Sequence, residues 1–344
     1  MDHMKRKQIG QTRLHVPALG FGGATLGDAN GPTSEHDALS SIDAAYSAGI
    51  DYFDTSPWYG NGKSELRFGT VLRTKPRSSF VLSTKVGRVY SRCTDPEHPS
   101  QQRWRGGLPF SPVFDYTRDG VLRSYEQSLL RLGVTSADAL IIHDLDEGHQ
   151  KTREGVEARF RELAEGRGFE ALAALKASRE ITAIGAGVNR LGMIRKFLDR
   201  FEIDFFLIAM PYTLLNQDAL DEELPLCISR GVSVVIGAPF ASGILASGPV
   251  PGATYGYLSA TDQINEKVRQ IAAVCGRHHV PLGAAALQFP LAHPAVVSVV
   301  PGPSASDHVR KNLQWFAHAI PTAFWHDLKS DRLLRAEAPI PVGS

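Results

Sequence analysis

Short apolar stretches recur along the chain and alternate with longer amphipathic segments. The short stretches are almost continuously apolar, which is typical of parallel strands that are covered on both faces. We predict eight strands, at residues 18–22, 50–53, 80–84, 139–142, 183–188, 205–209, 232–237 and 296–300.

The segments between these strands carry apolar residues at the spacing of a helix. The pattern is clearest at residues 36–48, 169–178 and 264–275. Eight strand–helix units predict an α/β fold, a (β/α)8 TIM barrel, as a single domain over residues 1–344 with its core at about 9–316. Weak alternation at residues 7–16 predicts an N-terminal β-hairpin ahead of the barrel.

A doubly wound parallel sheet is the alternative architecture. A dinucleotide-binding sheet of that kind carries Gly-x-Gly-x-x-Gly in its first turn. Here the glycine-rich turn is Gly20-Phe21-Gly22-Gly23, which lacks that spacing. The barrel is therefore favoured.

Two segments are too long for simple strand–helix connections, residues 88–116 and 241–261. Both follow a predicted strand, so we expect long loops at the C-terminal face of the barrel, where such loops usually serve function. The first contains Trp104 and either walls a substrate pocket or packs on the barrel rim. The second is rich in glycine, and we expect it to fold over a cofactor. Residues beyond Ala317 show no clear motif and predict a tail.

Composition excludes several classes of partner. The 37 basic and 36 acidic side chains leave a formal net charge of +1, which is too small to attract nucleic acid or an acidic membrane. No run approaches the roughly 18 apolar residues that span a bilayer, and the charged N-terminus has no apolar signal core. Three scattered cysteines argue against a disulfide framework, and no residue set has metal-ligand spacing. We expect a soluble cytoplasmic protein without a metal; the sequence leaves the oligomeric state open.

Four ionisable residues stand at or just beyond the ends of predicted strands. Asp54 and Tyr59 follow the second strand, Lys85 the third and His143 the fourth. Because the C-terminal ends of parallel strands share one mouth, we expect these side chains to converge. Taken singly, each also has a structural interpretation: a turn-capping acid, a packed aromatic, a solvated strand end and a hydrogen-bonded core histidine.

In this order and at these positions, Asp54, Tyr59, Lys85 and His143 resemble the catalytic tetrad of the aldo-keto reductase superfamily. The turn at Gly20 to Gly23 and the pair Pro301-Gly302 also resemble that family, and the resemblance covers essentially residues 9–316. Within the family, the chain looks most like the sugar 1-dehydrogenases and pyridoxal 4-dehydrogenase, on the evidence of residues 54–60, 82–88 and 142–146.

The resemblance implies a role for each member of the tetrad. Tyr59 would exchange a proton with the substrate oxygen, Lys85 would favour the phenolate, Asp54 would hold the ammonium, and His143 would orient the oxygen. These roles agree with elementary chemistry, because a free phenol has a pKa of about 10 and a nearby ammonium lowers it. Asp144 and Asp146, next to His143, also look like an acid–base pair. We expect them to be structural or to bind substrate hydroxyls.

A dinucleotide cofactor is required, since no side chain accepts a hydride. By resemblance, Asn189 binds the nicotinamide carboxamide. The other expected cofactor contacts are Gly22, Ser242, Gly243, Gly302, Ser304, His308 and Asn312. The family's usual Gln on the sixth strand and Tyr on the seventh are replaced by Ala209 and Gly237.

We expect NAD in preference to NADP. Members of the family that use NADP carry a Lys and an Arg where this chain has Gly302 and His308. Such cations hold the adenosine 2′-phosphate. Asp307 adds a negative charge at that place, although Arg310 would reach it after a shift of register.

Trp58 and Trp104 are the expected substrate contacts. The resemblance implies oxidation of a cyclic hemiacetal, either an aldose at C1 or pyridoxal, to a lactone, and of the two we favour an aldose. Two alternatives stay open: an NADPH-dependent aldehyde or ketone reductase, and a dinucleotide-binding regulatory subunit.

Overall fold

Eight parallel strands form one sheet, and their order in the sheet is their order along the chain. The computed structural model describes residues 2–29, 31–95, 104, 106–256 and 258–341. The strands are β3 (Phe21–Gly22), β4 (Tyr52–Asp54), β5 (Val81–Val86), β8 (Ala139–Ile142), β9 (Ala183–Val188), β10 (Phe205–Ile208), β11 (Ser233–Ile236) and β14 (Val296–Val299). Each predicted strand is present, with small shifts at its ends.

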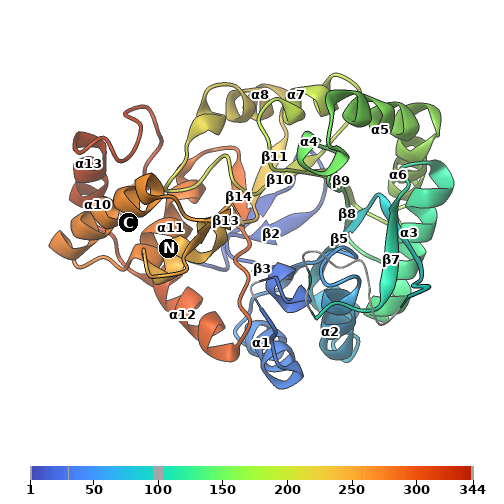
Figure 1. Ribbon diagram of the computed structural model, residues 1–344, viewed down its shortest axis with the longest axis horizontal. Coiled ribbons are helices and arrows are strands. Elements are labelled where there is room, and N and C mark those ends of the chain that lie inside the picture. The colour runs from blue at the N-terminus through green and yellow to red at the C-terminus, as the bar shows by residue number, and fades with distance from the viewer. Residues whose placement is uncertain (1, 30, 96–103, 105, 257, 342–344) are drawn as a thin grey trace.

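The sheet closes on itself between its first and last strands. Leu19 and Val299 form a parallel bridge. The Gly20 amide donates to the Val299 carbonyl at 2.9 Å, and the Gly22 amide donates to the Pro301 carbonyl at 2.8 Å. Together with the ring of helices around the sheet (Figure 1), this closure gives the predicted TIM barrel.

Helices alternate with the strands and cover the outside of the barrel (Figure 1). They are α1 (Glu35–Ser47), α2 (Lys63–Leu72), α3 (Arg118–Leu132), α4 (Glu147–Gln150), α5 (Arg153–Glu165), α6 (Gly168–Ala177), α7 (Met193–Leu198), α8 (Glu223–Arg230), α9 (Ile244–Ser247), α10 (Asp262–Arg277), α11 (Leu282–Gln288), α12 (Ser306–Ala317) and α13 (Thr322–Ser330). The 3-10 helices are η1 (Ala24–Gly27), η2 (Arg77–Ser79), η3 (Asp218–Leu220), η4 (Ala241–Gly243) and η5 (Phe289–Ala292). Within the described ranges, none of the helices is both long and apolar enough to cross a membrane.

The predicted N-terminal hairpin closes one end of the barrel. It pairs β1 (Arg6–Gln8) with β2 (His15–Pro17) in antiparallel fashion. Its Ile9, Leu14 and Val16 belong to the same apolar cluster as the inward side chains of the strands. Because the N-terminal end is filled in this way, a ligand has access from the C-terminal end.

The two long segments at the C-terminal face contain regular structure. Residues 88–116 hold an antiparallel hairpin of β6 (Arg88–Arg92) and β7 (Phe110–Phe114), so part of the expected long loop is regular structure. Residues 241–261 hold η4, α9 and a short hairpin of β12 (Thr254–Tyr255) and β13 (Leu258–Ser259). Parts of the predicted loops, residues 96–103, 105 and 257, lie outside the described residues.

The predicted tail is also partly helical. Helix α13 packs Phe324, Trp325 and Leu328 into the main hydrophobic core, and Leu334 and Ala338 follow them. A nine-residue helix with three core contacts leaves only a weak periodic signal.

Candidate active site

Asp54 and Lys85 form a buried ion pair at the open end of the barrel. Asp54 ends β4, and Lys85 lies near the end of the neighbouring strand β5. The Lys85 Nζ atom donates to Asp54 Oδ2 and to the Thr55 carbonyl, both at 2.7 Å. Ser83 Oγ donates to the other carboxylate oxygen at 2.7 Å. Lys85 is fully buried and Asp54 is 2% exposed, so the charges are held away from water.

Tyr59 and His143 complete the group that the sequence predicted. The Lys85 Nζ atom lies 4.8 Å from the centroid of the Tyr59 ring. The Tyr59 and His143 rings meet edge to face, with 6.0 Å between their centroids. His143 Nδ1 lies 3.2 Å from Ser56 Oγ. Burial, aided by Lys85 and Arg88, lowers the pKa of His143 well below its usual 6.5 although Asp144 opposes this, so the ring is neutral at pH 7.

Asp144 and Asp146 form a polar wall beside His143. Asp144 has a φ of 57°, and its Oδ2 atom lies 2.7 Å from a guanidinium nitrogen of Arg88. Burial raises the pKa of Asp144, but His143, Arg88 and His149 outweigh it, so the pKa lies well below its usual 3.8. Asp146 Oδ1 lies 3.0 Å from His149 Nδ1, and Asn189 Nδ2 donates to Asp146 Oδ2 at 3.5 Å. Both carboxylates therefore remain ionised and partnered at pH 7.

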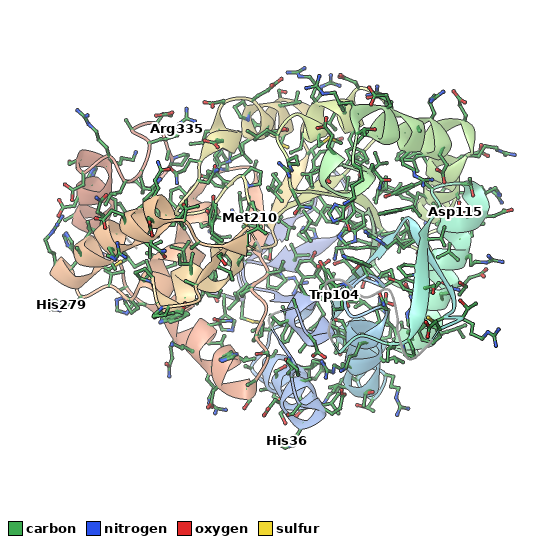
Figure 2. The ribbon with its side chains drawn as sticks, in the orientation of Figure 1. His36, Trp104, Asp115, Met210, His279 and Arg335 are labelled. Atoms are coloured by element: carbon green, nitrogen blue, oxygen red, sulfur yellow. The ribbon has the colours of Figure 1, made fainter. Side chains whose placement is uncertain are left out.

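A cavity of about 510 Å³, here named the aromatic pocket, opens above this group. Trp58, Tyr59 and Trp104 line it, and the polar residues that face it are His143, Asp144, Asp146, His149, Asn189 and Arg190. Trp104 meets the Tyr59 ring at 5.8 Å and the Trp58 ring at 5.8 Å, centroid to centroid. Met210 also lines the pocket. Figure 2 labels Trp104 and Met210 near the middle of the view. The predicted substrate contacts Trp58 and Trp104 thus share one cavity with Tyr59 and His143 of the predicted tetrad.

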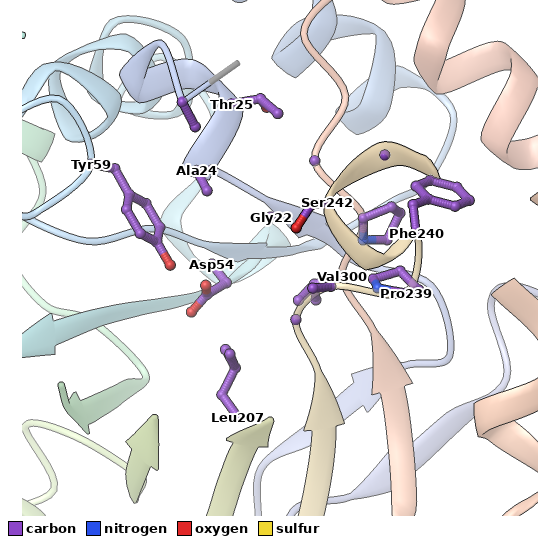
Figure 3. Close-up of a pocket in the computed structure, with 17 residues that line it drawn as sticks. Gly22, Ala24, Thr25, Asp54, Tyr59, Leu207, Pro239, Phe240, Ser242 and Val300 are labelled. Atoms are coloured by element: carbon purple, nitrogen blue, oxygen red, sulfur yellow. The ribbon is translucent and has the colours of Figure 1, made fainter. Parts of the chain in front are cut away.

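A second cavity, the glycine pocket, adjoins the first. Its glycine lining consists of Gly22, Gly23, Gly237, Gly243 and Gly302. Tyr59, Ala24, Leu207 and Gly237 line both pockets, so the two adjoin at these residues. Figure 3 shows Tyr59 and Phe240 on opposite sides of the glycine pocket, with Asp54 and Gly22 between them.

The glycine pocket suits a dinucleotide because backbone forms much of its wall. A Cβ atom on Gly22 would lie 2.6 Å from the Val300 carbonyl oxygen, so this wall has no room for a side chain. Ser242 and Gly243 on η4 and Gly302 after β14 also line this pocket, and their contact with a cofactor stays a prediction. Among the described residues that line this pocket, there is no Lys and no Arg. A pocket of about 120 Å³ with this lining could hold part of a dinucleotide, chiefly through backbone contacts.

The remaining predicted cofactor residues lie elsewhere. Asn189 lines the aromatic pocket, not the glycine pocket. Ser304, His308 and Asn312 line neither cavity: Ser304 Oγ lies 3.2 Å from His308 Nδ1 on the surface, and Asn312 is buried on α12. Their contact with a cofactor stays a prediction.

Several lining residues were not predicted from the sequence. Leu207 on β10 occupies the space beside Gly237, since a Cβ atom there would lie 2.5 Å from Leu207 Cδ2. Further examples are Thr25, Arg88, Phe240 and Tyr255, which line a pocket or contact its walls. Thr25, Arg88 and Phe240 each follow a barrel strand closely, and that position is the signal that points to them. In the described part of the chain, no cluster of His, Cys, Asp or Glu is arranged to hold a metal ion.

Comparison with known proteins places the chain in a family. The profile of the aldo/keto reductase family matches residues 18–331. The chain is 39% identical over 343 residues to pyridoxal 4-dehydrogenase of Microbacterium luteolum, covering 96% of this chain and 99% of that one. It is 36% identical over 332 residues to D-threo-aldose 1-dehydrogenase of a Pseudomonas species, covering 93% and 95%.

A solved structure gives the same answer for the fold. An aldo-keto reductase from Bacillus halodurans, in its holo form, superposes with a TM-score of 0.74 at 27% identity, covering 98% of each chain. The chain therefore belongs to the aldo/keto reductase family and is an NAD(P)-dependent oxidoreductase.

Proposed function

We propose that this enzyme oxidises a cyclic hemiacetal, an aldose at C1 or pyridoxal, to the lactone, with NAD as cofactor. The observation that carries the proposal is the position of Tyr59. It lines both pockets, and the Lys85 ammonium lies 4.8 Å from its ring centroid. A substrate hydroxyl in the aromatic pocket thus lies beside Tyr59 as the proton acceptor. The glycine pocket, proposed to hold the cofactor, adjoins the aromatic pocket at Tyr59.

The oxidation breaks the C–H bond of the anomeric carbon and the O–H bond of its hydroxyl, and a C=O bond forms between that carbon and oxygen. When bound, the nicotinamide takes up the hydride. Tyr59, as phenolate, takes the proton from the anomeric hydroxyl, Lys85 stabilises the phenolate by its charge, and Asp54 keeps the ammonium in place. His143 is neutral, so it orients the substrate oxygen by hydrogen bonding and adds no charge.

The lining of the aromatic pocket supports a ring that bears hydroxyls. Aromatic rings of Trp58 and Trp104 cover one part of it, whereas Asp144, Asp146 and Asn189 offer hydrogen bonds from another. A pyranose has a C–H face for the aromatic rings and hydroxyls for the carboxylates. The two dehydrogenases named above, one of pyridoxal and one of an aldose, are similar to this chain to nearly the same degree. We favour an aldose because of the two carboxylates.

The charges near α12 support NAD. Arg310, which a register shift would bring to the cofactor, forms an ion pair with Asp307 on the surface. The Lys311 ammonium lies 4.6 Å from the centroid of the Trp315 ring. Both cations are thus engaged in contacts within their own helix, and the described lining of the glycine pocket adds none.

A steady-state assay tests the proposal directly. Aldoses, pyridoxal and simple aldehydes are offered with NAD or NADP, and with the reduced forms for the aldehydes, and the absorbance of reduced nicotinamide is followed. We expect oxidation of a cyclic hemiacetal with NAD and release of a lactone. Reduction of open-chain aldehydes alone, with NADPH, would instead favour the reductase. The absence of turnover with every pair would favour a regulatory subunit.

A further inference from the structure

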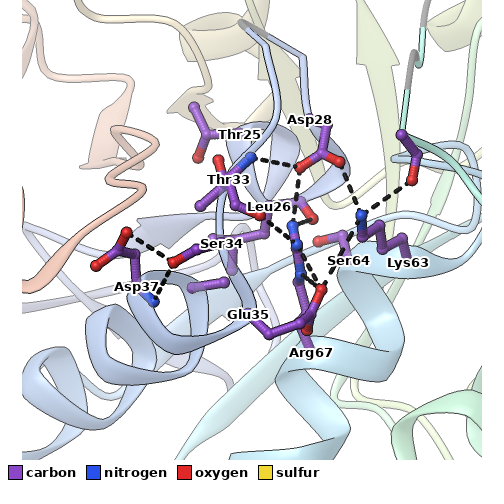
Figure 4. A network of polar contacts seen from close by, with 12 residues as sticks. Thr25, Leu26, Asp28, Thr33, Ser34, Glu35, Asp37, Lys63, Ser64 and Arg67 are labelled. Atoms are coloured by element: carbon purple, nitrogen blue, oxygen red, sulfur yellow. Dashed lines mark hydrogen bonds and ion pairs between the residues drawn. The ribbon is translucent and has the colours of Figure 1, made fainter.

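One ammonium ion links segments that wall the two pockets. Lys63 is the first residue of α2, just after the loop that carries Tyr59. Its Nζ atom donates to Asp28 Oδ2 at 2.8 Å and to the Gly106 carbonyl at 3.0 Å. Asp28 and Gly106 belong to segments far apart in the sequence, and Figure 4 shows the Lys63 ammonium beside Asp28. Glu35 Oε1 lies 4.0 Å from the same ammonium.

Each of these segments carries a pocket wall. Asp28 directly follows η1 as its C-cap, and Ala24 and Thr25 of η1 line the glycine pocket. Gly106 follows Trp104, which lines the aromatic pocket and is 1% exposed. The Lys63 ammonium therefore holds a wall of the cofactor cavity and a wall of the substrate cavity at the same time.

The segment of Asp28 has a second anchor. Asp28 is 2% exposed, and its Oδ1 atom accepts a hydrogen bond from Arg67 at 3.0 Å and from the Thr33 amide at 3.1 Å. Arg67 also donates to the Leu26 carbonyl at 2.6 Å. Removal of the Lys63 ammonium thus leaves η1 held by Arg67.

The segment of Trp104 is tied to the Tyr59 loop at other points. The Leu108 amide donates to the Gly60 carbonyl at 2.9 Å, and Asn61 Nδ2 donates to the Leu108 carbonyl at 3.3 Å. Both of these bonds are made by Leu108, whereas the bond from Lys63 is made at Gly106, which is closer to Trp104 in the sequence. A Cβ atom on Gly106 would collide with Asp28 Oδ2, so at this point the segment lies directly on the carboxylate. Loss of the ammonium removes the hydrogen bond at the Gly106 carbonyl, two residues from Trp104, whereas η1 keeps its hydrogen bonds to Arg67.

We propose that Lys63 is a positioning residue that holds Trp104 against the ring of Tyr59 and so sets the affinity for substrate. It acts through Trp104, which lies 5.8 Å from the Tyr59 ring, centroid to centroid. The inference rests on the proposed site around Tyr59. It predicts that Lys63 affects substrate binding far more than cofactor binding, although its ion pair joins both walls.

The test compares Lys63→Met, Lys63→Arg and a control, Lys75→Met. Lys75 lies three residues beyond the end of α2, and it makes a 2.8 Å ion pair with Asp43 on the surface. We expect Lys63→Met to raise KM for the hemiacetal about tenfold, to change kcat less than twofold, and to leave the dissociation constant of the cofactor unchanged. Lys63→Arg restores most of the KM because a guanidinium still reaches a carboxylate and a carbonyl. Lys75→Met leaves all three constants at the wild-type value.

Tryptophan fluorescence gives a second readout that needs no turnover. We expect Lys63→Met to alter the emission of the free enzyme, and we expect this change to vanish in a Trp104→Phe background. An unchanged KM in Lys63→Met overturns the inference, and so does an equal loss of substrate and cofactor binding. Tyr59→Phe is assayed in parallel: if it stays active, the proposed site is wrong, whereas an inactive Tyr59→Phe with an unaffected Lys63→Met refutes only the role of Lys63.

Discussion

The two halves of the active site are built in opposite ways. Around Tyr59, buried charged side chains fix one another: Lys85 with Asp54, and Arg88 with Asp144. Around the glycine pocket, the wall is largely backbone, and its described lining carries neither Lys nor Arg. In the proposed function, proton transfer thus depends on which side chains are present, and cofactor binding depends on where side chains are absent. Substitutions in the charged half should therefore lower turnover or stability, whereas substitutions in the wall of the glycine pocket should weaken cofactor binding.

The largest expected effect is on the charged half. Tyr59→Phe keeps the ring and removes only the hydroxyl, so it removes the proposed proton acceptor. We expect kcat to fall by about 10²–10⁴-fold, with cofactor binding unchanged. Stopped-flow turnover and cofactor titration measure the two quantities. Activity close to wild type would contradict the assignment of the acid–base residue.

Asp144→Asn tests whether the buried charges also hold the fold. The substitution leaves Arg88, which is 5% exposed, without its carboxylate, and loss of one partner of a buried pair costs about 3–5 kcal/mol. Because the folded pKa of Asp144 is lowered from 3.8, its contribution is fully present above pH 3.8 and is lost as the pH falls through the folded pKa. Urea denaturation should show a large difference in the free energy of unfolding between wild type and variant at pH 7. This difference should become smaller below pH 3.8.

The matched control is Asp43→Asn, which breaks the exposed pair with Lys75. It should change the free energy of unfolding by no more than about 1 kcal/mol at either pH. If Asp144→Asn lowers the free energy of unfolding equally at both pH values, the packing of the Asp144 side chain matters and its charge does not.

Gly22→Ala tests the backbone half. The new Cβ atom would lie 2.6 Å from the Val300 carbonyl oxygen, and overpacking of this kind costs about 1–3 kcal/mol. We expect weaker binding of the dinucleotide, measured by quenching of protein fluorescence. Gly276→Ala on α10 is the control, since nothing lies within 4 Å of its added Cβ atom. Equal cofactor affinity in wild type and Gly22→Ala would show that the cofactor does not contact this wall.

The smallest expected effect concerns the choice of dinucleotide. We expect kcat/KM for NAD to exceed that for NADP at least tenfold, because two charge-assisted contacts to the 2′-phosphate are missing. Gly302→Lys combined with His308→Arg supplies two cations and should narrow the ratio. A ratio near one in the wild type would show that another cation holds the phosphate.

The sequence predicted the charged half better than the backbone half. The strands of the barrel are apolar and the tetrad residues stand at their ends, so parallel pairing alone brings Asp54, Lys85 and His143 together. Leu207 beside Gly237, and Lys63 between two distant segments, depend on tertiary packing that no local pattern encodes. The same holds for the β6–β7 hairpin, because β6 begins with three consecutive buried residues and β7 has only exposed and half-buried ones, so neither strand alternates.

The glycine pocket lies along the seam where the barrel closes. Partners across this seam, such as Ser298 and Ala18, are 280 residues apart in sequence, so their pairing waits for nearly the whole chain. We expect amide hydrogen exchange to report the seam as an early site of local opening. A dinucleotide that touches Gly22 and Gly302 together would bridge the seam and favour the closed barrel by mass action. The cofactor would then also protect the enzyme from proteolytic turnover, and its supply would help to set how much of the protein persists in the cell.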